Sequence, residues 1–262
     1  MKKFFVSIPH SGEQVPEECD WLQGLDEAHL MRDVDRYVDR LYESPIKELS
    51  LDLVYSPWHR YVVDLNRLPE HIEKASVQGQ ENQLSDFHNK GLHWVKTTFG
   101  ETLLEKPMSR DLHERLLKNY YQGFHDEVEK MHQKYIKENS FSLQLDLHSM
   151  PSKGTALHAD PGKLRPEVVI SDFLGKSTDR KYLDLVLESF KDNFSEVSLN
   201  DPYIGGGITR KFGKPSQSKH CIQIELRRDM YMDEDTKEFL KEKAALLTDK
   251  LSKALKKISS SL

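Results

Sequence analysis

Cysteine is scarce in this chain of 262 residues, which contains two, Cys19 and Cys221. They are far apart in the sequence, and neither belongs to a C-x-x-C pair. This excludes the disulfide framework of small secreted domains and the cysteine-rich zinc motifs. We therefore expect the reducing environment of the cytoplasm. We also expect Cys221, which falls in an apolar segment, to be a buried small hydrophobe rather than a nucleophile.

Long hydrophobic runs and an excess of positive charge are also missing. No apolar stretch approaches the roughly 18 residues that indicate a membrane-spanning helix. The apolar segment at residues 4–8 is shorter than the roughly 7–15 residues of a secretory signal core, so we interpret it as a buried strand. The formal net charge of −5 provides no basic field for nucleic acid or anionic lipid. We expect neither partner, and the oligomeric state stays open.

Short apolar segments bounded by turn residues are present, and they predict strands. They are residues 4–8, 53–57, 61–65, 142–148, 167–173 and 221–226. Between them, apolar residues at spacings of three and four predict helices. These cover residues 27–49, 109–138, 178–195 and 233–258.

This alternation predicts a single α/β domain over residues 1–262, with a mixed, mainly parallel sheet flanked by helices. Residues 68–108 show no comparable periodicity. An irregular segment of that length in a compact domain is typical of an active-site lid or of disorder.

Four segments place polar side chains at the ends of predicted strands, where ligands bind in open α/β sheets. They are SIPHSGE with His10 and Glu13, VVDLNR with Asp64, Asn66 and Arg67, LDLHSM with Asp146 and His148, and IQIELRRD with Glu225 and Arg227. Each alone is more typical of a structural histidine, a turn or a salt bridge. Together they contain the two histidines and a carboxylate of a catalytic zinc site, a glutamate for proton transfer, and an arginine for a substrate carboxylate. The combination points to metal-assisted hydrolysis of an amide next to a carboxylate.

These segments resemble the N-formylglutamate amidohydrolase family, which is related in fold to the zinc carboxypeptidases and the aspartoacylase-like deacylases. The resembling segments are SIPHSG, RDVDRYVDRLYE, RYVVDLNRLPE, GLHWVKTTFGETLLEKPMS, LQLDLHSM, SDFLGKSTD, GGGITRKFGKP and HCIQIELRRDMYMDE. They follow one another along nearly the whole chain. The resemblance implies the phosphorylase/hydrolase-like architecture of the carboxypeptidases. It also implies hydrolysis of a small N-acyl amino acid, with N-formyl-L-glutamate giving formate and L-glutamate.

The resemblance also implies roles for individual residues. His10 and His148 would bind the metal, which would be Zn²⁺ or another divalent ion such as Co²⁺ or Mn²⁺. Glu225 would act as general base and then as general acid. Asn66 and Arg67 would bind a substrate carboxylate, and Arg210, in GGGITR, would act as a catalytic and substrate-binding residue on a loop that closes over the substrate.

The third metal ligand has two candidates. His10 and Glu13 have the H-x-x-E spacing of the carboxypeptidases, whereas the amidohydrolase family has a D-x-D at the start of the next helix, here Asp33-Val34-Asp35. We predict Asp35, with Glu13 as the alternative. Without the resemblance, RDVDRYVDR is typical of a solvated helix face.

Further residues receive weaker predictions. Asp146 is two positions before His148 on a strand, so it would orient that imidazole or form a structural salt bridge. His125 is a candidate for contact with the substrate or with a residue that supports the site, while packing or ion pairing is expected of His220 and Arg60.

Two departures from the family pattern leave the substrate open. Arg36 stands where a tryptophan is common after the D-x-D, and a glycine precedes Ile-Thr-Arg where an aromatic residue is usual. The acyl group and the amino acid therefore stay undetermined. The alternatives to an N-acyl amino acid hydrolase are a carboxypeptidase or peptidoglycan-type amidase, and a non-catalytic protein that binds carboxylated ligands.

Overall fold

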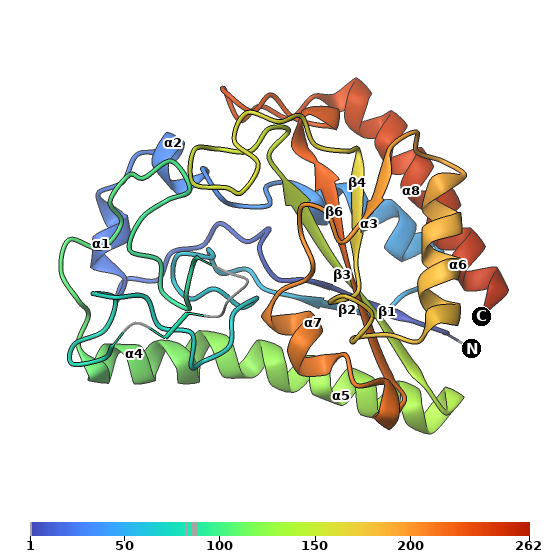
Figure 1. Cartoon of the computed structure of the whole chain (residues 1–262), viewed down its shortest axis with the longest axis horizontal. Coiled ribbons are helices and arrows are strands. Elements are labelled where there is room, and N and C mark those ends of the chain that lie inside the picture. Colours follow the sequence, from blue (N-terminus) through green and yellow to red (C-terminus); the bar gives the residue numbers. More distant parts are fainter. Residues whose placement is uncertain (1, 82, 85–88) are drawn as a thin grey trace.

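The structure is a computed structural model that describes residues 2–81, 83–84 and 89–262. Its described residues form one six-stranded sheet with the strand order β2-β1-β3-β6-β4-β5 (Figure 1). The strands are β1 (Phe5–Ile8), β2 (Leu53–Tyr55), β3 (Ser142–Met150), β4 (Val168–Ser171), β5 (Val197–Leu199) and β6 (Lys219–Arg227). The first four in spatial order are parallel, and β4 runs antiparallel to β6 with β5 parallel to it. The predicted mixed, mainly parallel α/β sheet is confirmed.

Helices cover both faces of the sheet. They are α1 (Asp20–Gln23), α2 (Glu27–Leu30), α3 (Val38–Glu48), α4 (Arg110–Leu116), α5 (Gln122–Asn139), α6 (Arg180–Lys191), α7 (Gly207–Phe212) and α8 (Lys241–Ser261), with a π-helical turn (Leu117–Tyr121) joining α4 to α5. In Figure 1, α3, α6 and α8 lie on one side of the sheet, and α5 and α7 lie on the other. No helix in the described part of the chain has the length and apolar character needed to cross a bilayer.

The two faces of the central strands differ in chemistry. Leu143, Leu145 and Leu147 of β3 pack into a core with α3, α6 and α8. The alternate residues of β3 are Gln144, Asp146 and His148, and all are buried on the other face. Since side chains alternate between the faces of a strand, SLQLDLHSM supplies an apolar core on one side and a buried polar row on the other.

A second hydrophobic core covers the face that carries the polar row. It joins α5 and α7 to the irregular segment before α4, with Leu92, Trp94 and Leu104 among its buried residues. As expected, the described part of residues 68–108 contains no helix or strand. This segment, predicted as a lid or as disorder, includes residues 82 and 85–88, which lie outside the described residues.

Two predicted elements are wrong in ways that matter for the site. Residues 61–65 are not a strand. Their apolar side chains pack into the second core, and the amide of Asp64 donates to Leu92 O instead of to a neighbouring strand. The predicted helix 27–49 is broken into α2 and α3. Asp33 and Asp35 lie in the break with buried, hydrogen-bonded carboxylates, which a continuous surface helix would not bury.

Candidate metal centre

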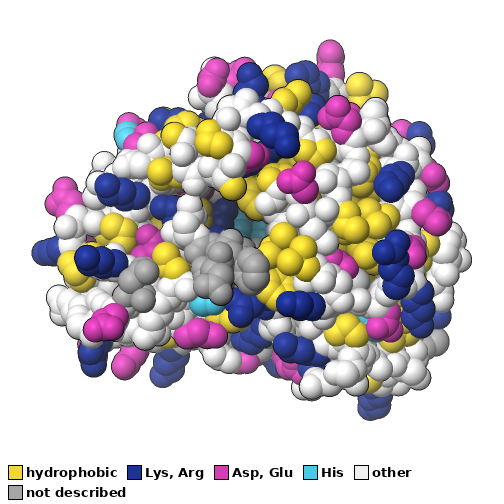
Figure 2. Space-filling model, viewed as in Figure 1, with side chains coloured by type: hydrophobic (Ala, Val, Ile, Leu, Met, Phe, Trp, Pro, Cys, Tyr) yellow, Lys and Arg dark blue, Asp and Glu magenta, His cyan; other side chains and the backbone are white. Residues whose placement is uncertain are grey.

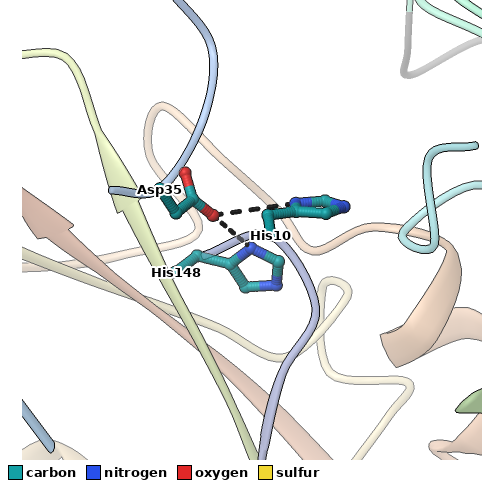
Figure 3. Close-up of side chains that lie close together, drawn as sticks. All are labelled: His10, Asp35 and His148. Atoms are coloured by element: carbon teal, nitrogen blue, oxygen red, sulfur yellow. Dashed lines mark hydrogen bonds and ion pairs between the residues drawn. The ribbon is translucent and has the colours of Figure 1, made fainter. Parts of the chain in front are cut away.

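Three side chains from distant parts of the chain meet at the carboxyl end of the parallel strands. His10 follows β1, Asp35 precedes α3, and His148 belongs to β3. One nitrogen or oxygen atom from each lies within 4.8 Å of the others. Asp35 Oδ2 is 3.6 Å from His10 Nδ1 and 3.0 Å from His148 Nδ1 (Figure 3). The residues are 1–2% exposed, so the group is shielded from bulk water.

Local structure holds these residues together. Strands β1 and β3 are parallel neighbours, which brings the segment after β1 close to the end of β3. The amide of Asp35 donates to the carbonyl oxygen of His10 over 3.0 Å. Gly12 lets the chain after His10 pass close to the segment after β2, because a Cβ there would lie 2.3 Å from the carbonyl carbon of Pro57.

Both imidazoles have a carboxylate at Nε2. His10 Nε2 lies 2.8 Å from Asp64 Oδ1, and His148 Nε2 lies 2.9 Å from Asp146 Oδ2. A proton on Nε2 of His148, next to Asp146, leaves the lone pair of Nδ1 for a metal ion, and Nδ1 of both rings faces Asp35. This carboxylate–histidine arrangement is typical of metal-binding histidines.

The donor set fits a divalent metal ion. Neither ring nitrogen of His10 makes a well-aligned hydrogen bond, which is costly for a buried polar group without a further partner. Two imidazole nitrogens and a carboxylate oxygen are the ligands of catalytic zinc sites that keep a position open.

Charges around Asp35 and Asp64 favour their ionised forms. Burial raises the pKa of Asp35, but the adjacent imidazoles of His10 and His148 and nearby positive charges outweigh it and hold the pKa below its ordinary range. For Asp64, burial also opposes ionisation, and the charge of Arg60 is the largest influence that lowers its pKa. Arg60 and the indole of Trp94 donate to Asp64 Oδ2 over 2.9 and 3.0 Å.

Arg228 contacts the oxygen of Asp35 that does not face the two histidines. Its guanidinium donates to Asp35 Oδ1 over 3.0 Å. Arg227, which ends the same strand as Glu225, was singled out from the sequence as a strand-end residue, and Arg228 was not. In the structure Arg227 pairs with Asp229 and Glu196, and a 3₁₀ turn after β6 directs Arg228 inward. The contact of Asp64 with His10 was also not predicted. Residues 61–65 form an irregular segment, and the sequence pattern does not show where the side chains of such a segment point.

Glu225 lies beside the three residues. It is paired in register with His148 on the parallel strands β3 and β6, so both side chains project from the same face. Its Oε1 accepts a hydrogen bond from Gln223 Nε2 over 2.8 Å. Burial is the main cause that raises its pKa to about 7; the charge of His148 opposes the shift and that of Asp35 adds to it. A carboxyl group with such a pKa is suited to proton transfer near neutrality.

These residues line a cavity of about 520 Å³. Five cationic side chains line it as well: Arg60, Arg67, Lys90, Arg165 and Arg228. Figure 2 shows a hollow near the centre of the viewed face, with Lys and Arg side chains and histidine atoms at it. The cavity therefore combines a buried His–Asp–His group, a carboxyl group with a raised pKa, and several positive charges.

The model of the N-formylglutamate amidohydrolase family matches residues 2–232. This chain belongs to the N-formylglutamate amidohydrolase family. It is 29% identical over 235 residues to the N-formylglutamate deformylase of Pseudomonas aeruginosa, covering 87% of this chain and 82% of the relative. The corresponding enzyme of Pseudomonas putida is 27% identical over 237 residues, covering 87% and 81%.

Solved structures share the fold. The N-formylglutamate amidohydrolase of Ralstonia eutropha JMP134 aligns with a TM-score of 0.83 at 23% identity, covering 98% of this chain and 94% of that one. A gene product of Agrobacterium tumefaciens aligns with a TM-score of 0.74 at 19% identity, covering 99% and 91%. Membership of the family identifies the chain as an amidohydrolase.

In this amidohydrolase Asn66 and Arg67 lie on an irregular segment rather than at the end of a strand. The side-chain amide of Asn66 donates to Gln223 Oε1 over 3.0 Å and accepts from the amide of Ile208 over 2.9 Å. A Cβ at Gly206 would lie 2.3 Å from that amide group, so the glycine-rich loop packs directly on Asn66. Arg67 lines the cavity and donates to the carbonyl oxygens of Lys90 and Asn66.

Two predicted residues lie away from the amidohydrolase cavity. The carboxylate of Glu13 is 40% exposed and pairs with Arg36 over 2.8 Å, outside the His–Asp–His group. Arg210 lines a separate cavity of about 540 Å³ and contacts His71 Nε2 over 3.3 Å. The structure therefore brings Asp35 and not Glu13 to the histidines, and it does not bring Arg210 to Glu225.

The remaining predicted residues have structural partners. His125 Nε2 donates to Leu65 O over 3.0 Å, which supports the segment that carries Asp64 and Asn66. His220 Nδ1 accepts from the amide of Asp179 at the start of α6. Cys221 is buried in the second core, and burial raises the pKa of its thiol, which disfavours the nucleophilic thiolate.

Proposed function

We propose that this chain is a metal-dependent amidohydrolase that converts N-formyl-L-glutamate and water into formate and L-glutamate. The observation that carries the proposal is the adjacency of the His10–Asp35–His148 group and Glu225 at one wall of a cationic cavity. The names of the relatives in two Pseudomonas species support the substrate.

The metal ion would be held by His10 Nδ1, Asp35 Oδ2 and His148 Nδ1. Zn²⁺ is the first choice for two imidazoles and one carboxylate, with Co²⁺ or Mn²⁺ as alternatives. Once bound, the ion supplies Lewis acidity towards water and the amide carbonyl. Asp64 and Asp146 hold the imidazoles in the orientation that presents Nδ1.

Glu225 would carry the proton. Its Oε1 is held by Gln223, which leaves Oε2 to accept a proton from the attacking water. The oxygen of that water forms a bond to the formyl carbon, and the carbon–nitrogen bond then breaks. Glu225 returns the proton to the departing nitrogen, so that glutamate leaves as an amine and the carboxyl group is ready for another cycle.

Two cations are available for the two carboxylates of the substrate. Arg60, Arg165 and Arg228 are paired with Asp64, Asp160 and Asp35. Arg67 and Lys90 also line the cavity, and no ion pair joins either to a carboxylate of the described residues. We assign the substrate carboxylates to Arg67 and Lys90. Lys90 takes the place that the sequence argument gave to Arg210, while Asn66 holds the glycine-rich loop.

The size of the cavity favours a small substrate. A volume of about 520 Å³ is within the ordinary range of small-molecule sites, and its lining cations suit a compact dianion. The presence of Glu225 at the ligand group favours catalysis over simple binding of carboxylated compounds.

The test is turnover of N-formyl, N-acetyl and N-succinyl derivatives of glutamate and of neutral amino acids by chelator-stripped protein with added Zn²⁺, Co²⁺ or Mn²⁺. We expect N-formyl-L-glutamate to give the highest kcat/KM, and activity to depend on added metal. Full activity of the metal-free protein would refute metal dependence. Preference for a neutral amino acid would refute the carboxylate assignment.

A further inference from the structure

A line of hydrogen bonds extends from His148 through the buried polar face of the sheet. Beyond the 2.9 Å contact of His148 Nε2 with Asp146 Oδ2, Ser7 Oγ lies 2.5 Å from Asp146 Oδ1. Gln144 Nε2 lies 2.7 Å from Ser7 Oγ, and His132 Nε2 lies 2.9 Å from Gln144 Oε1. The line connects β3 to β1, returns to β3 and ends on α5.

The direction of every hydrogen bond in this line follows from chemistry. Ser7 donates its hydroxyl proton to Asp146 Oδ1, because a carboxylate oxygen accepts. The oxygen of Ser7 then accepts from the amide nitrogen of Gln144, whose carbonyl oxygen accepts from His132 Nε2. His132 Nδ1 is left to accept from the hydroxyl of Ser142, whose oxygen lies 2.7 Å from it and 3.4 Å from its other acceptor, Ser218 O.

The surroundings favour this single arrangement. Ser7, Gln144, Asp146 and His132 have no exposed surface. The ring of His132 stacks on Phe212 and meets the edge of Phe5, which limits its rotation. Burial lowers the pKa of His132 to about 4, so the ring is neutral near pH 7 and can donate with one nitrogen and accept with the other.

The carboxylates behind the two histidines are supported differently. Asp64, behind His10, accepts hydrogen bonds from Arg60, Trp94 and the amide of Asn66. Asp146, behind His148, accepts one side-chain hydrogen bond other than that of His148 among the described residues, and it comes from Ser7. The orientation of Asp146 therefore depends on Ser7, and that of the Ser7 hydroxyl on Gln144 and His132.

We propose that Ser7, Gln144 and His132 are positioning residues that act through Asp146 to keep the proton of His148 on Nε2 and so present Nδ1 to the metal ion. This inference rests on the proposed metal centre. It extends the centre from its ligands to the buried His132 on α5, and it assigns a function to the buried polar residues of β3.

The decisive comparison is Ser7→Thr against Ser7→Val. The two replacements have nearly the same size and shape, and they differ in the hydroxyl that donates to Asp146. The measurement is the Zn²⁺ dissociation constant, obtained by competition with a chromophoric chelator. We expect Ser7→Val to bind Zn²⁺ about 10–100-fold more weakly than Ser7→Thr, the usual cost of removing the hydrogen-bond partner of a metal ligand. Equal affinities would overturn the proposal.

Gln144→Met and His132→Gln test the more distant members. We expect the loss of affinity to decrease from Ser7→Val to Gln144→Met to His132→Gln, because each step acts through one more hydrogen bond. The matched control is Ser189→Ala, which removes a buried hydroxyl that donates to Leu185 O on α6. It should lower the thermal stability of the metal-free protein without changing the Zn²⁺ affinity. If Gln144→Met and His132→Gln behave in the same way as this control, the proposed relay, which is the line of hydrogen bonds from His132 through Gln144 and Ser7 to Asp146, is refuted.

The tautomer of His132 gives a readout that needs no metal. In metal-free protein at pH 7, ¹⁵N–¹H correlation spectra of the histidine rings should show His132 neutral, with its proton on Nε2. A proton on Nδ1 would reverse the line and overturn the proposal. Failure of the wild-type protein to bind Zn²⁺ would refute the proposed metal centre and the relay with it. Equal Zn²⁺ affinity of Ser7→Thr and Ser7→Val would refute the relay alone.

Discussion

His148 and Glu225 are directly paired across the parallel strands β3 and β6, and both line the same cavity. Because the pairing is set by backbone hydrogen bonds of the central sheet, the sheet itself fixes the separation between a proposed metal ligand and the proposed proton carrier. Loops then supply what the sheet does not: His10, Asp35 and the cations of the cavity.

Glu225→Gln removes the proposed proton carrier while it keeps the size of the side chain. We expect kcat for N-formyl-L-glutamate to fall roughly 10²–10⁴-fold, the usual contribution of general acid–base catalysis, with Zn²⁺ affinity close to that of the wild type. Release of formate measures the rate. Glu13→Gln is the matched control and should retain kcat, because Glu13 pairs with Arg36 away from the cavity. Near wild-type turnover by Glu225→Gln would remove Glu225 from the mechanism.

Asp35→Asn and Glu13→Gln distinguish the two candidates for the third ligand. Asp35 lies between His10 and His148, so its neutral amide should weaken Zn²⁺ binding by more than the roughly 10–100-fold cost of losing a ligand's hydrogen-bond partner. Glu13→Gln should bind like the wild type. Chelator competition measures both, and the opposite order of affinities would return the role to Glu13.

Arg67→Met and Lys90→Met test the assignment of the two substrate carboxylates. Each replaces a cationic side chain that forms no ion pair with a carboxylate of the described residues. We therefore expect kcat/KM to fall about 10–100-fold, mainly through a higher KM. Arg210→Met is the control because Arg210 lines the other cavity. A larger loss in Arg210→Met than in Arg67→Met would show that the glycine-rich loop rearranges when substrate binds.

Stability should decrease as the pH falls below about 6.5. Burial lowers the pKa of His93 to about 3, with the neighbouring His113 adding to the shift, and burial lowers that of His59 to about 4. In the unfolded chain these rings take up protons near pH 6.5, whereas in the folded protein they stay neutral to about pH 4 or below. The stability that the neutral rings contribute is complete above pH 6.5. It is lost as the pH falls from about 6.5 to the pKa of each ring in the folded protein, by at most about 1.4 kcal/mol per pH unit for each ring.

Urea unfolding between pH 7 and pH 5 measures this dependence. His93→Gln should lower stability at pH 7, because His93 Nδ1 donates to Val62 O in the second core, and it should also reduce the slope against pH. A free energy of unfolding that stays constant over this range would contradict the prediction.

Much of this protein follows from local patterns in the sequence. Alternation of Leu with Gln, Asp and His in β3 and of Ile with Gln and Glu in β6 determines both the strands and the face on which His148 and Glu225 lie. His10 follows the first of these parallel strands, so its place at their carboxyl edge also follows from local structure. The α/β class was predictable for the same reason, because the period of each segment is a property of neighbouring residues.

Only the tertiary structure decided which other groups reach these strand ends. Asp35 was preferred to Glu13 by resemblance, but its position depends on a break between α2 and α3 that buries it against His10, His148 and Arg228. Lys90 reaches the cavity on an irregular segment, whereas Arg210 lies on α7 and lines the other cavity. Both placements depend on packing against distant residues and leave no period in the sequence. Local periodicity determines the face of a strand, whereas the partner of a buried charge is decided by contacts between segments far apart in the chain.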